Sequence, residues 1–596
     1  MPCDLRARFG PFEADLQTGE LFQSGEKLSL QEKPFEILSL LLQTPDHLLT
    51  REEISSKVWP DVHVQAQSDH CLNTAIRRLR AVLEKADPNE HLIETVGHRG
   101  YRLHADVKLS PDLASAVSHA DHRPRLAVVP FENLNEGDPD HFAHGFTAQM
   151  IVQLGRLCKE MSIVAPVSSL YFNGATKSPE QVARELHVDY LLVGSVWRVP
   201  PRLRITTRLT RTADDSCVWS ESYARDETEI FKLQEEITRA IAQGLRQALP
   251  EPEGTSLPES LTTLPAIYET YLKARLFSFK FVQTSFETAI QLFEHVIEQD
   301  PNFAPAYAAL AHMLTAAVTF GGPPHRVFYE RIEKLAGKAL ELSERLPEAH
   351  SALGWLRCWQ ADWAQSENSF LRALEINPNF SLGYCGYARL LSVLGRHEQA
   401  IALGKRARQL DPLSPLVHRM LGIELYHAGQ LHEAIECQRS AIEIDPGFCV
   451  AHAMLGFIYQ EMGELDRAVR SLRVAVEKAP DTPLMSCFLA RSLAAAGETE
   501  EATRILEELL QLRETNCIPA TSIALVYAAL REREHAWSWL MTAMHELDPW
   551  RCHMGVDPRF RFFWKDPRFA RLLHGMGLLW RRQHSRTHRY SPAHRK

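Results

Sequence analysis

The stretch LNTAIRRLRAVL (residues 72–83) decides how the N-terminal part of this chain is interpreted. On a helical wheel Leu72, Ile76, Leu79 and Leu83 fall within one narrow stripe, the pattern of a helix anchored in a core. The whole chain is acidic, with a formal net charge of −9, yet this stretch carries three arginines within four positions. It therefore predicts either an ordinary solvated helix face or a helix that meets a polyanion. The side chains of interest opposite the stripe, or flanking it, are Asn73, Thr74, Arg77, Arg78 and Arg80.

The segments around this helix predict a small α+β domain over residues 1–107. Three short alternating strands come first, and two helices follow that open with capping boxes, Ser29 with Glu32 and Thr50 with Glu53. Ser68 is a candidate cap for the third helix, which contains residues 72–83. The stretch LIETVGHRGYRLH (92–104) then predicts a hairpin. This order of elements is a helix-turn-helix followed by a wing.

The charge distribution favours a DNA interface on the third helix and the wing. Residues 1–107 hold 12 Lys/Arg against 17 Asp/Glu, but seven of the 12 fall on the elements that would face DNA. Clustered cations matter more than net charge for phosphate contact, because salt screens distant charges. Small residues let a helix enter the major groove, where Arg can bind guanine and Asn adenine. The predicted double-stranded DNA contacts are Asn73, Thr74, Arg77, Arg78, Arg80, Arg99 and Arg102.

Beyond residue 107 the periodicity of the sequence changes twice. Residues 108–125 predict a polar linker, and residues 126–249 alternate strands and helices as in a small α/β domain. A Pro-rich linker, 250–265, leads into a helical region with a 34-residue repeat. We expect about eight repeat units over 266–550, a capping segment over 551–580, and a basic tail over 581–596.

The repeat is visible as columns of residues in register. Four prolines, four glycines and four alanines each recur every 34 positions, at 378–480, 395–497 and 400–502. A two-helix unit of this kind cannot bury its apolar face alone, so the units are expected to stack into an all-α solenoid with a concave groove.

The composition and motifs of the chain argue against several other classes of protein. The eleven cysteines show no CxxC spacing, which argues against a disulfide framework or a zinc site and favours a reducing cytoplasm. No signal peptide and no run of 18 apolar residues is present, so no membrane partner is expected. No phosphate loop, nucleophile elbow or zinc helix occurs. We therefore expect no enzyme activity, no cofactor and no metal.

Four motifs of residues 1–107 together resemble the OmpR/PhoB-type winged-helix DNA-binding domain: LSLQEKPFEILSLLL, LTREEISSKVW, LNTAIRRLRAVL and IETVGHRGYRL. The resemblance implies that the third helix reads the major groove and that the wing reaches the adjacent minor groove. By position, Thr74 and Arg78 would contact bases, Arg77 and Arg80 phosphates or bases, and Arg99 the groove. Such domains bind tandem half-sites, which implies a possible dimer on DNA. No receiver domain precedes the winged helix, so control by aspartate phosphorylation is not expected.

Two further resemblances cover the remaining regions. RLAVVPFENL, ARELHVDYLLVGSV and WSESYARDETEIFKLQEEI resemble a TolB-like α/β domain, and the 34-residue units resemble tetratricopeptide repeats. The sequence thus predicts a cytoplasmic, sequence-specific transcription regulator. Its middle domain would couple the two ends, and its repeats would receive a protein or peptide in their groove. The rival interpretation is a scaffold whose winged helix docks proteins, and the salt dependence of DNA binding distinguishes the two.

Overall fold

The computed structural model describes most of the chain between residues 6 and 578. Within that range it does not describe residues 10–11, 16–18, 24–25, 29, 44–47, 59–64, 87–91, 98, 106, 111–122, 136–140, 173–176, 200, 248–263, 280–282, 320–324 and 514–517. The chain divides into two compact units, Met1–His122 and Arg123–Lys596. Of the predicted Pro-rich linker, 250–265, only residues 264 and 265 are described, and the predicted basic tail, 581–596, lies entirely outside the described residues.

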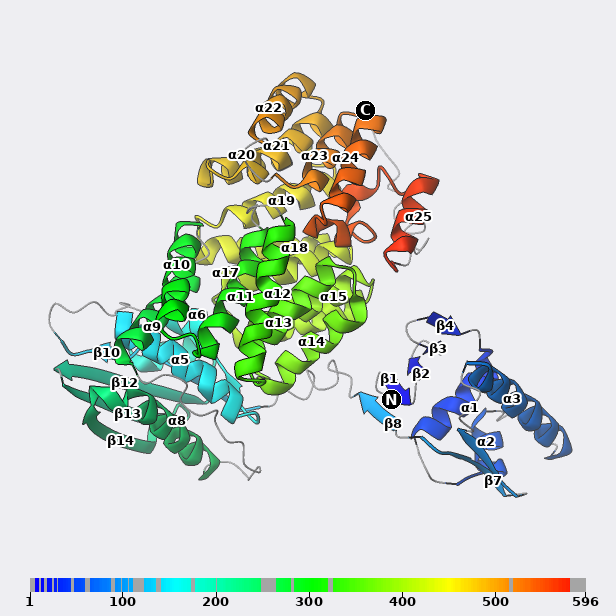
Figure 1. The fold of residues 1–596 in the computed structure, drawn as a ribbon, viewed down its shortest axis with the longest axis horizontal. Coiled ribbons are helices and arrows are strands. Elements are labelled where there is room, and N and C mark those ends of the chain that lie inside the picture. The colour runs from blue at the N-terminus through cyan, green and yellow to red at the C-terminus, as the bar shows by residue number, and fades with distance from the viewer. Residues whose placement is uncertain are drawn as a thin grey trace. The chain divides into compact units, whose positions relative to one another are not determined.

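In its described residues, the first unit combines three helices with two antiparallel sheets (Figure 1). One sheet has the order β4-β3-β2-β1-β8, and the other has the order β5-β7-β6. The helices are α1 (Glu32–Gln43), α2 (Arg51–Val58) and α3 (Gln65–Ala86). The strands are β1 (Arg6–Phe9), β2 (Phe12–Asp15), β3 (Glu20–Gln23), β4 (Glu26–Leu28), β5 (Leu49–Thr50), β6 (Ile93–Val96), β7 (Gly100–Leu103) and β8 (Val107–Ser110).

Three details of this unit test the expectations from the sequence. The Thr50–Glu53 capping box is confirmed, because Glu53 N–H donates to the Thr50 hydroxyl at 3.2 Å and Thr50 N–H donates to the Glu53 carboxylate at 2.8 Å. Helix α3 begins at Gln65, so Ser68 lies inside the helix and the cap expected there was wrong. The expected cap at Ser29 lies outside the described residues. Strand β8 pairs with β1, so ordered structure continues past residue 107 into the segment expected to be a linker.

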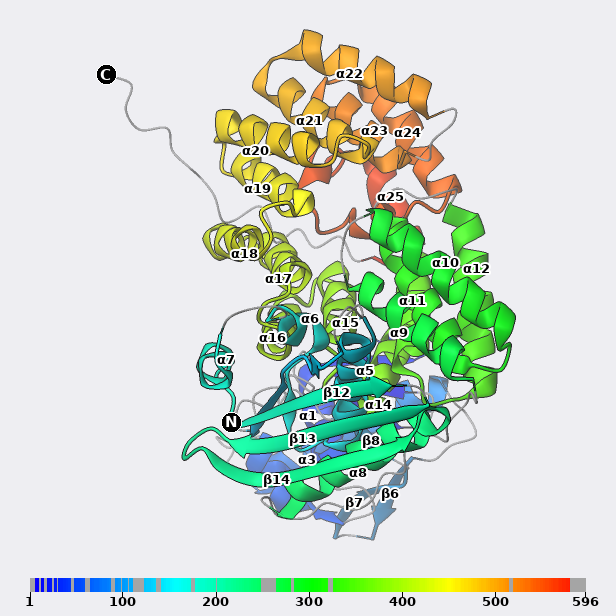
Figure 2. The same ribbon diagram turned by 90° about the vertical axis from the view of Figure 1, so that its left-hand side faces the viewer.

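The second unit begins with a mixed sheet in the order β11-β9-β12-β13-β14 (Figure 2). Strands β11, β9 and β12 are parallel, β10 adds a parallel bridge to β12, and β13 and β14 are antiparallel. Along β13, buried and exposed residues alternate, so one face of the sheet is covered and the other faces solvent. The elements are β9 (Arg125–Val128), β10 (Glu132–Asn133), α5 (His141–Leu157), β11 (Ser162–Ile163), α6 (Pro166–Leu170), α7 (Pro179–Leu186), β12 (Tyr190–Val199), β13 (Arg202–Arg211), β14 (Ser216–Asp226), η1 (Glu227–Glu229) and α8 (Ile230–Gln247).

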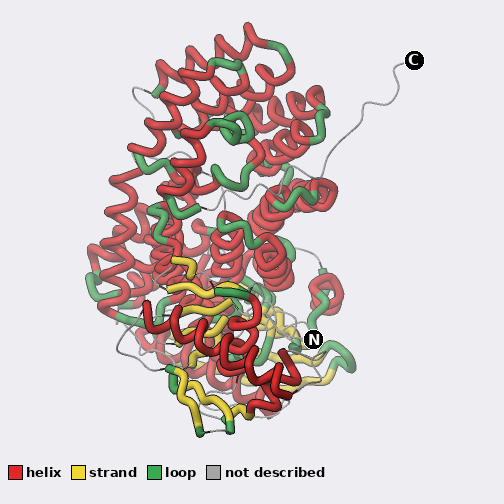
Figure 3. The backbone as a smooth tube through the Cα atoms, turned by 90° about the vertical axis from the view of Figure 1, so that its right-hand side faces the viewer, coloured by secondary structure: helices red, strands yellow, loops and turns green. Residues whose placement is uncertain are grey.

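A long all-helical array follows, which Figure 3 shows as a run of helices without strands between them. Glycines 395, 429, 463 and 497 end the first helix of their repeats with φ of 76°, 79°, 81° and 93°. This left-handed conformation suits glycine and turns the chain toward the next helix. The helices are α9 (Pro265–Ser278), α10 (Gln283–Gln299), α11 (Ala304–Thr319), α12 (His325–Leu342), α13 (Pro347–Trp359), α14 (Trp363–Ile376), α15 (Ser381–Val393), α16 (His397–Leu410), α17 (Pro415–His427), α18 (Leu431–Ile444), α19 (Cys449–Glu461), α20 (Leu465–Lys478), α21 (Pro483–Ala496), α22 (Thr499–Leu512), α23 (Ala520–Ala529) and α24 (Arg533–His545).

The residues after α24 return to helices from much earlier in the array. We call residues 547–578 the C-terminal segment; it contains η2 (Pro549–His553), η3 (Pro558–Phe560) and α25 (Pro567–Gly575). Tyr329 of α12 donates to the Leu547 carbonyl at 2.8 Å, and Arg551 donates to the Trp359 carbonyl at 2.9 Å. The Trp363 indole donates to the Met576 carbonyl at 2.7 Å. The C-terminal segment therefore joins α12–α14 to the far end of the array.

The mixed sheet domain is hydrogen-bonded to two turns between repeats, those that contain Pro378 and Pro412. Asn379 donates to the Gly155 carbonyl at 3.1 Å and accepts from Ile163 N–H at 3.0 Å. In the next repeat, the buried Asp411 accepts from the N–H of Ser168 at 3.0 Å and from its hydroxyl at 2.5 Å. Buried hydrogen bonds of this kind fix one arrangement, because breaking them would leave polar groups unpaired. The middle domain and the repeats therefore form one structure.

Candidate nucleic-acid interface

Helix α3 is anchored by the stripe that the sequence predicted. Leu72 and Leu79 are 0% exposed, and Ile76 and Leu83 are 2% and 3% exposed. These side chains belong to one hydrophobic core with residues of β1, β2, α1 and the wing hairpin, the pair β6–β7. On the other side of the helix Asn73, Arg77 and Arg78 are exposed, whereas Thr74 and Arg80 are half-buried. The predicted contact residues of α3 therefore lie on one outward side of the helix, but their side chains are exposed to different extents.

Among the cations of α3 whose side chains the structure describes, Arg77 and Arg78 are the most accessible. Arg77 has no hydrogen-bond or ion-pair partner among the described residues. Arg78 donates to the Gln31 side chain, which leads into α1. That single contact can be exchanged for a base or phosphate at little cost, because it is exposed and water or a DNA acceptor can replace the Gln31 amide oxygen. Both guanidinium groups are thus free to meet an anion.

Asn73 belongs to a small network that the sequence did not reveal. Its side-chain oxygen accepts from Arg51 at 2.6 Å and from the Tyr101 hydroxyl at 3.0 Å. Arg51 also donates to the Tyr101 hydroxyl at 3.0 Å, and its guanidinium carbon lies 5.4 Å from the centre of that ring. The network joins α2, α3 and β7. In the sequence, the one sign of this network is the position of Arg51, which directly follows the Thr50 cap at the start of a helix.

Arg80 connects α3 to the wing. Its guanidinium donates to the Ile93 carbonyl at 2.6 Å and to the Thr95 hydroxyl at 2.8 Å, both on β6. The other wing strand, β7, comes so close to β5 that a Cβ at Gly100 would lie 1.9 Å from the Leu49 carbonyl oxygen. Only glycine fits there. Contact of Arg80 with DNA stays a prediction, and its observed partners are within the domain.

The two wing arginines differ in their surroundings. Arg99 is exposed at the turn of the hairpin, where its carbonyl accepts from Arg51 N–H at 3.1 Å. Arg102 is half-buried on β7, and its guanidinium lies 3.6 Å from the carboxylate of Glu94. His104 lies 2.8 Å from the same carboxylate. Arg99 is therefore the wing arginine that is exposed to solvent, while Arg102 forms an ion pair with Glu94.

Comparison with known families agrees with this geometry. Residues 25–103 match the family described as "Transcriptional regulatory protein, C terminal". Residues 25–103 form an OmpR/PhoB-type winged-helix DNA-binding domain. Residues 369–402, 388–447 and 454–516 match families described as "Tetratricopeptide repeat". The winged-helix domain is thus followed, after the mixed sheet domain, by a tetratricopeptide-repeat array.

Curated relatives resemble larger parts of the chain. "Transcriptional regulator HilA" of Salmonella typhimurium (strain LT2) is 22% identical over 415 residues, which cover 69% of this chain and 72% of that protein. "Putative adenylate cyclase 3" of Rhizobium meliloti (strain 1021) is 30% identical over 254 residues. That match covers 41% of this chain and 42% of the length of the cyclase. Among solved structures, "DNA binding domain of E. coli CadC" is 24% identical, covering 18% of this chain and 100% of that chain, with a TM-score of 0.17.

One arrangement in the repeats resembles a catalytic triad but is sealed from solvent. The Ser392 hydroxyl lies 3.0 Å from His427 Nδ1, and His427 Nε2 lies 3.9 Å from the Asp557 carboxylate. These three residues are 0%, 3% and 1% exposed. Arg559 binds the same carboxylate at 2.6 Å. A substrate cannot reach this serine, and the cluster instead ties α15 and α17 to the C-terminal segment.

Neither a metal site nor a membrane-spanning helix is found in the described part of the chain. No group of three or more His, Cys, Asp or Glu side chains there is placed to hold a metal ion. No described helix is both long enough and apolar enough to cross a membrane.

Proposed function

We propose that this protein is a sequence-specific DNA-binding transcription regulator. The observation that carries the proposal is the pair Arg77 and Arg78, exposed on a helix whose opposite face is fixed in the core of an OmpR/PhoB-type domain. Clustered cations on one element attract phosphate, and arginine additionally recognises guanine through paired hydrogen bonds. The relative HilA, whose name describes a transcriptional regulator, matches over most of both chains and supports the same function.

Within this function the candidate residues divide into two groups. Arg77, Arg78 and Arg99 would contact DNA directly, with Thr74 close enough to a base to read it. Asn73, Arg80 and Arg102 would chiefly position α3 and the wing, since each has partners inside the domain. Binding of tandem half-sites by two copies would place two recognition helices in successive major grooves.

The remaining regions would carry the signal to this domain. We assign the mixed sheet, as a TolB-like domain, the role of a coupler, and its buried hydrogen bonds to the repeats support that role. The repeats would receive a protein or peptide signal in the cytoplasm. Because the C-terminal segment already contacts α12–α14, such a partner would either bind another surface of the repeats or displace this segment.

The dependence of binding on salt tests this proposal against a protein-docking scaffold. If the chain neutralises several phosphates, the logarithm of its DNA affinity falls linearly with the logarithm of salt concentration, with a slope of about −0.9 per phosphate contact. A docking module would bind DNA weakly at every salt concentration. A non-catalytic role is part of the same proposal, and turnover of ATP to cyclic AMP by the purified chain would contradict it.

A further inference from the structure

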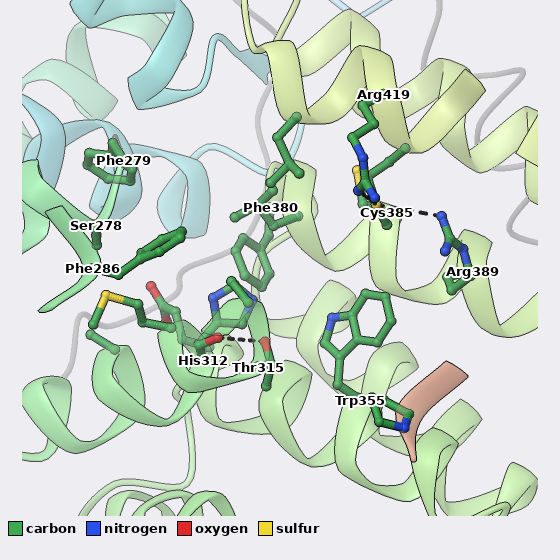
Figure 4. A pocket seen from close by; sticks show the side chains of 18 of the residues that line it. Ser278, Phe279, Phe286, His312, Thr315, Trp355, Phe380, Cys385, Arg389 and Arg419 are labelled. Atoms are coloured by element: carbon green, nitrogen blue, oxygen red, sulfur yellow. Dashed lines mark hydrogen bonds between the residues drawn. The ribbon is translucent and has the colours of Figure 1, made fainter. Parts of the chain in front are cut away.

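A cavity of about 150 Å³ lies inside the repeat array. Its walls come from α9–α11, α13, α15 and α17, together with η2 of the C-terminal segment. Figure 4 shows Phe279 and Phe286 on one side and Arg389 and Arg419 on the other, with Phe380 between them. The lining is therefore mostly apolar and aromatic, with Arg389 and Arg419 opposite Phe279, and with Arg275 and Glu348 also in the wall.

Several polar atoms that line this cavity lack a partner among the described residues. They are Nε of Arg419, Nε2 of His312, Nε1 of Trp550 and Nδ1 of His553, all shielded from solvent. In folded proteins almost every buried polar atom is hydrogen-bonded. Four such atoms around one cavity point to a partner that occupies it, either ordered water or a ligand with polar groups of its own.

Arg419 determines which charge that partner should carry. The residue is 8% exposed, and its one side-chain hydrogen bond in the described structure is a weak contact with the Met420 sulfur at 3.9 Å. Burial, reinforced by the charge of Arg389, lowers the pKa of Arg419 to about 9, so it remains a cation at neutral pH. The nearby Glu424 carboxylate favours the charged form of Arg419, but that carboxylate accepts its hydrogen bond from Arg389. A buried cation without a carboxylate bound to it is unfavourable, and an anion beside Arg419 would remove much of that penalty.

The other charges at the cavity are already paired. Arg389 donates to the Glu424 carboxylate at 2.8 Å. Glu348 lies 3.2 Å from Arg156 and 3.7 Å from Arg275, and although burial opposes it, these two cations hold the pKa of Glu348 below its usual value. Burial lowers the pKa of His312 to about 4, so that ring is neutral. Arg419 is thus the cation left for a ligand.

We propose that this cavity binds a small anionic metabolite, with an aromatic or similarly apolar body between Phe279 and Phe380 and its anionic group at Arg419. A cavity of this volume holds about one six-membered ring, as a cavity of similar size in another protein holds benzene. A guanidinium suits a carboxylate or a phosphate group because it offers several donors in a planar fork. Ligand binding here does not depend on the DNA-binding function.

Calorimetric titration of the full-length protein tests this proposal. The probes are benzoate, phenylacetate and phenyl phosphate, with benzamide and phenylacetamide as neutral counterparts. We expect at least one anion to bind and its neutral counterpart to bind far more weakly. Comparison of the carboxylates with phenyl phosphate identifies the anionic group. Arg419→Gln should weaken binding of the anion by at least about tenfold, the range expected for a charged hydrogen bond.

The matched control is Arg439→Gln, which removes an exposed arginine from α18 of the same repeat and should leave affinity unchanged. Thermal unfolding of each variant verifies that the repeats are folded, and Arg419→Gln is expected to melt no lower than the wild type because it removes an unpaired buried charge. The proposal is overturned if none of the anions binds the folded protein, or if an anion binds Arg419→Gln as tightly as the wild type. Those outcomes would indicate that water occupies the cavity.

Discussion

The guanidinium of Arg80 on α3 lies 2.6 Å from the Ile93 carbonyl and 2.8 Å from the Thr95 hydroxyl on β6. Arg80 therefore helps to hold α3 and the wing at a fixed separation, beside the hydrogen bond from Tyr101 to Asn73. Arg80→Ala should lower the free energy of unfolding of the winged-helix unit by about 1–3 kcal/mol, since it leaves a carbonyl without its charged donor. Urea unfolding of the full chain, followed in this unit by hydrogen exchange, measures the loss. An unchanged stability would show that Arg80 is not a structural link.

Arg99 offers a cleaner test of DNA contact because it is exposed and its side chain has no partner in the described structure. Arg99→Ala should leave thermal stability unchanged and weaken DNA binding by about 1–3 kcal/mol if the residue reads a groove. If it contacts a phosphate, the salt slope should decrease by about 1. Titrations of one DNA site at several salt concentrations separate these cases. Equal DNA affinity of the wild type and the variant would show that Arg99 of the wing does not contact DNA.

Asp411 should make the stability of the second unit depend on pH. Burial raises its pKa to about 6 from 3.8, despite its hydrogen bonds with Ser168. A raised pKa means that the folded state binds the proton more tightly. Its contribution to stability is therefore complete below pH 3.8 and is lost as pH rises through 6. The loss is on the order of 2–3 kcal/mol, at about 1.4 kcal/mol per pKa unit.

The comparison that isolates this group is Asp411→Asn, which cannot titrate but keeps an oxygen to accept from Ser168. The difference in unfolding free energy between wild type and Asp411→Asn should change across pH 4–6 and stay constant from pH 7 to 8. Calorimetric unfolding of both proteins across this range measures it. A difference that is flat over the whole range would mean that Asp411 has an ordinary pKa.

Gly456 should be intolerant of even one added methyl group. An added Cβ would lie 2.6 Å from Cγ of Leu472 on the partner helix, where α19 and α20 cross. Gly456→Ala should destabilise the repeats by about 1–3 kcal/mol, the usual cost of overpacking. Gly337→Ala is the control, because an added Cβ there would meet no atom within 4 Å and alanine favours a helix. Equal melting temperatures for the two variants would contradict the close crossing.

Local and periodic features of the fold could be predicted from the sequence. The stripe of Leu72 and Leu79, the Thr50–Glu53 box and the small residues at helix crossings all depend on neighbours within a few positions or on a repeated spacing. Such patterns repeat in the sequence because each turn or repeat faces the same physical constraint.

Contacts between distant residues could not be predicted in this way. Strand β8 pairs with β1 about a hundred residues earlier, and Arg51 reaches Asn73 and Tyr101 from a different helix. The bonds between Ser168 and Asp411 and the return of the C-terminal segment to Trp359 span still more of the chain. None of these has a spacing that recurs. The Arg419 cavity was missed for the same reason, because its walls come from six helices and η2.

The central claim, that Arg77 and Arg78 read DNA, is tested most directly by selecting genomic fragments with the full-length protein. Wild type and an Arg77→Ala, Arg78→Ala double variant are compared at low and physiological salt. The predicted result is that the wild type enriches a few short sequences at both concentrations and that the variant, folded normally, loses that enrichment. Weak, equal and sequence-independent binding by both proteins would contradict it and would favour a scaffold whose winged helix docks proteins.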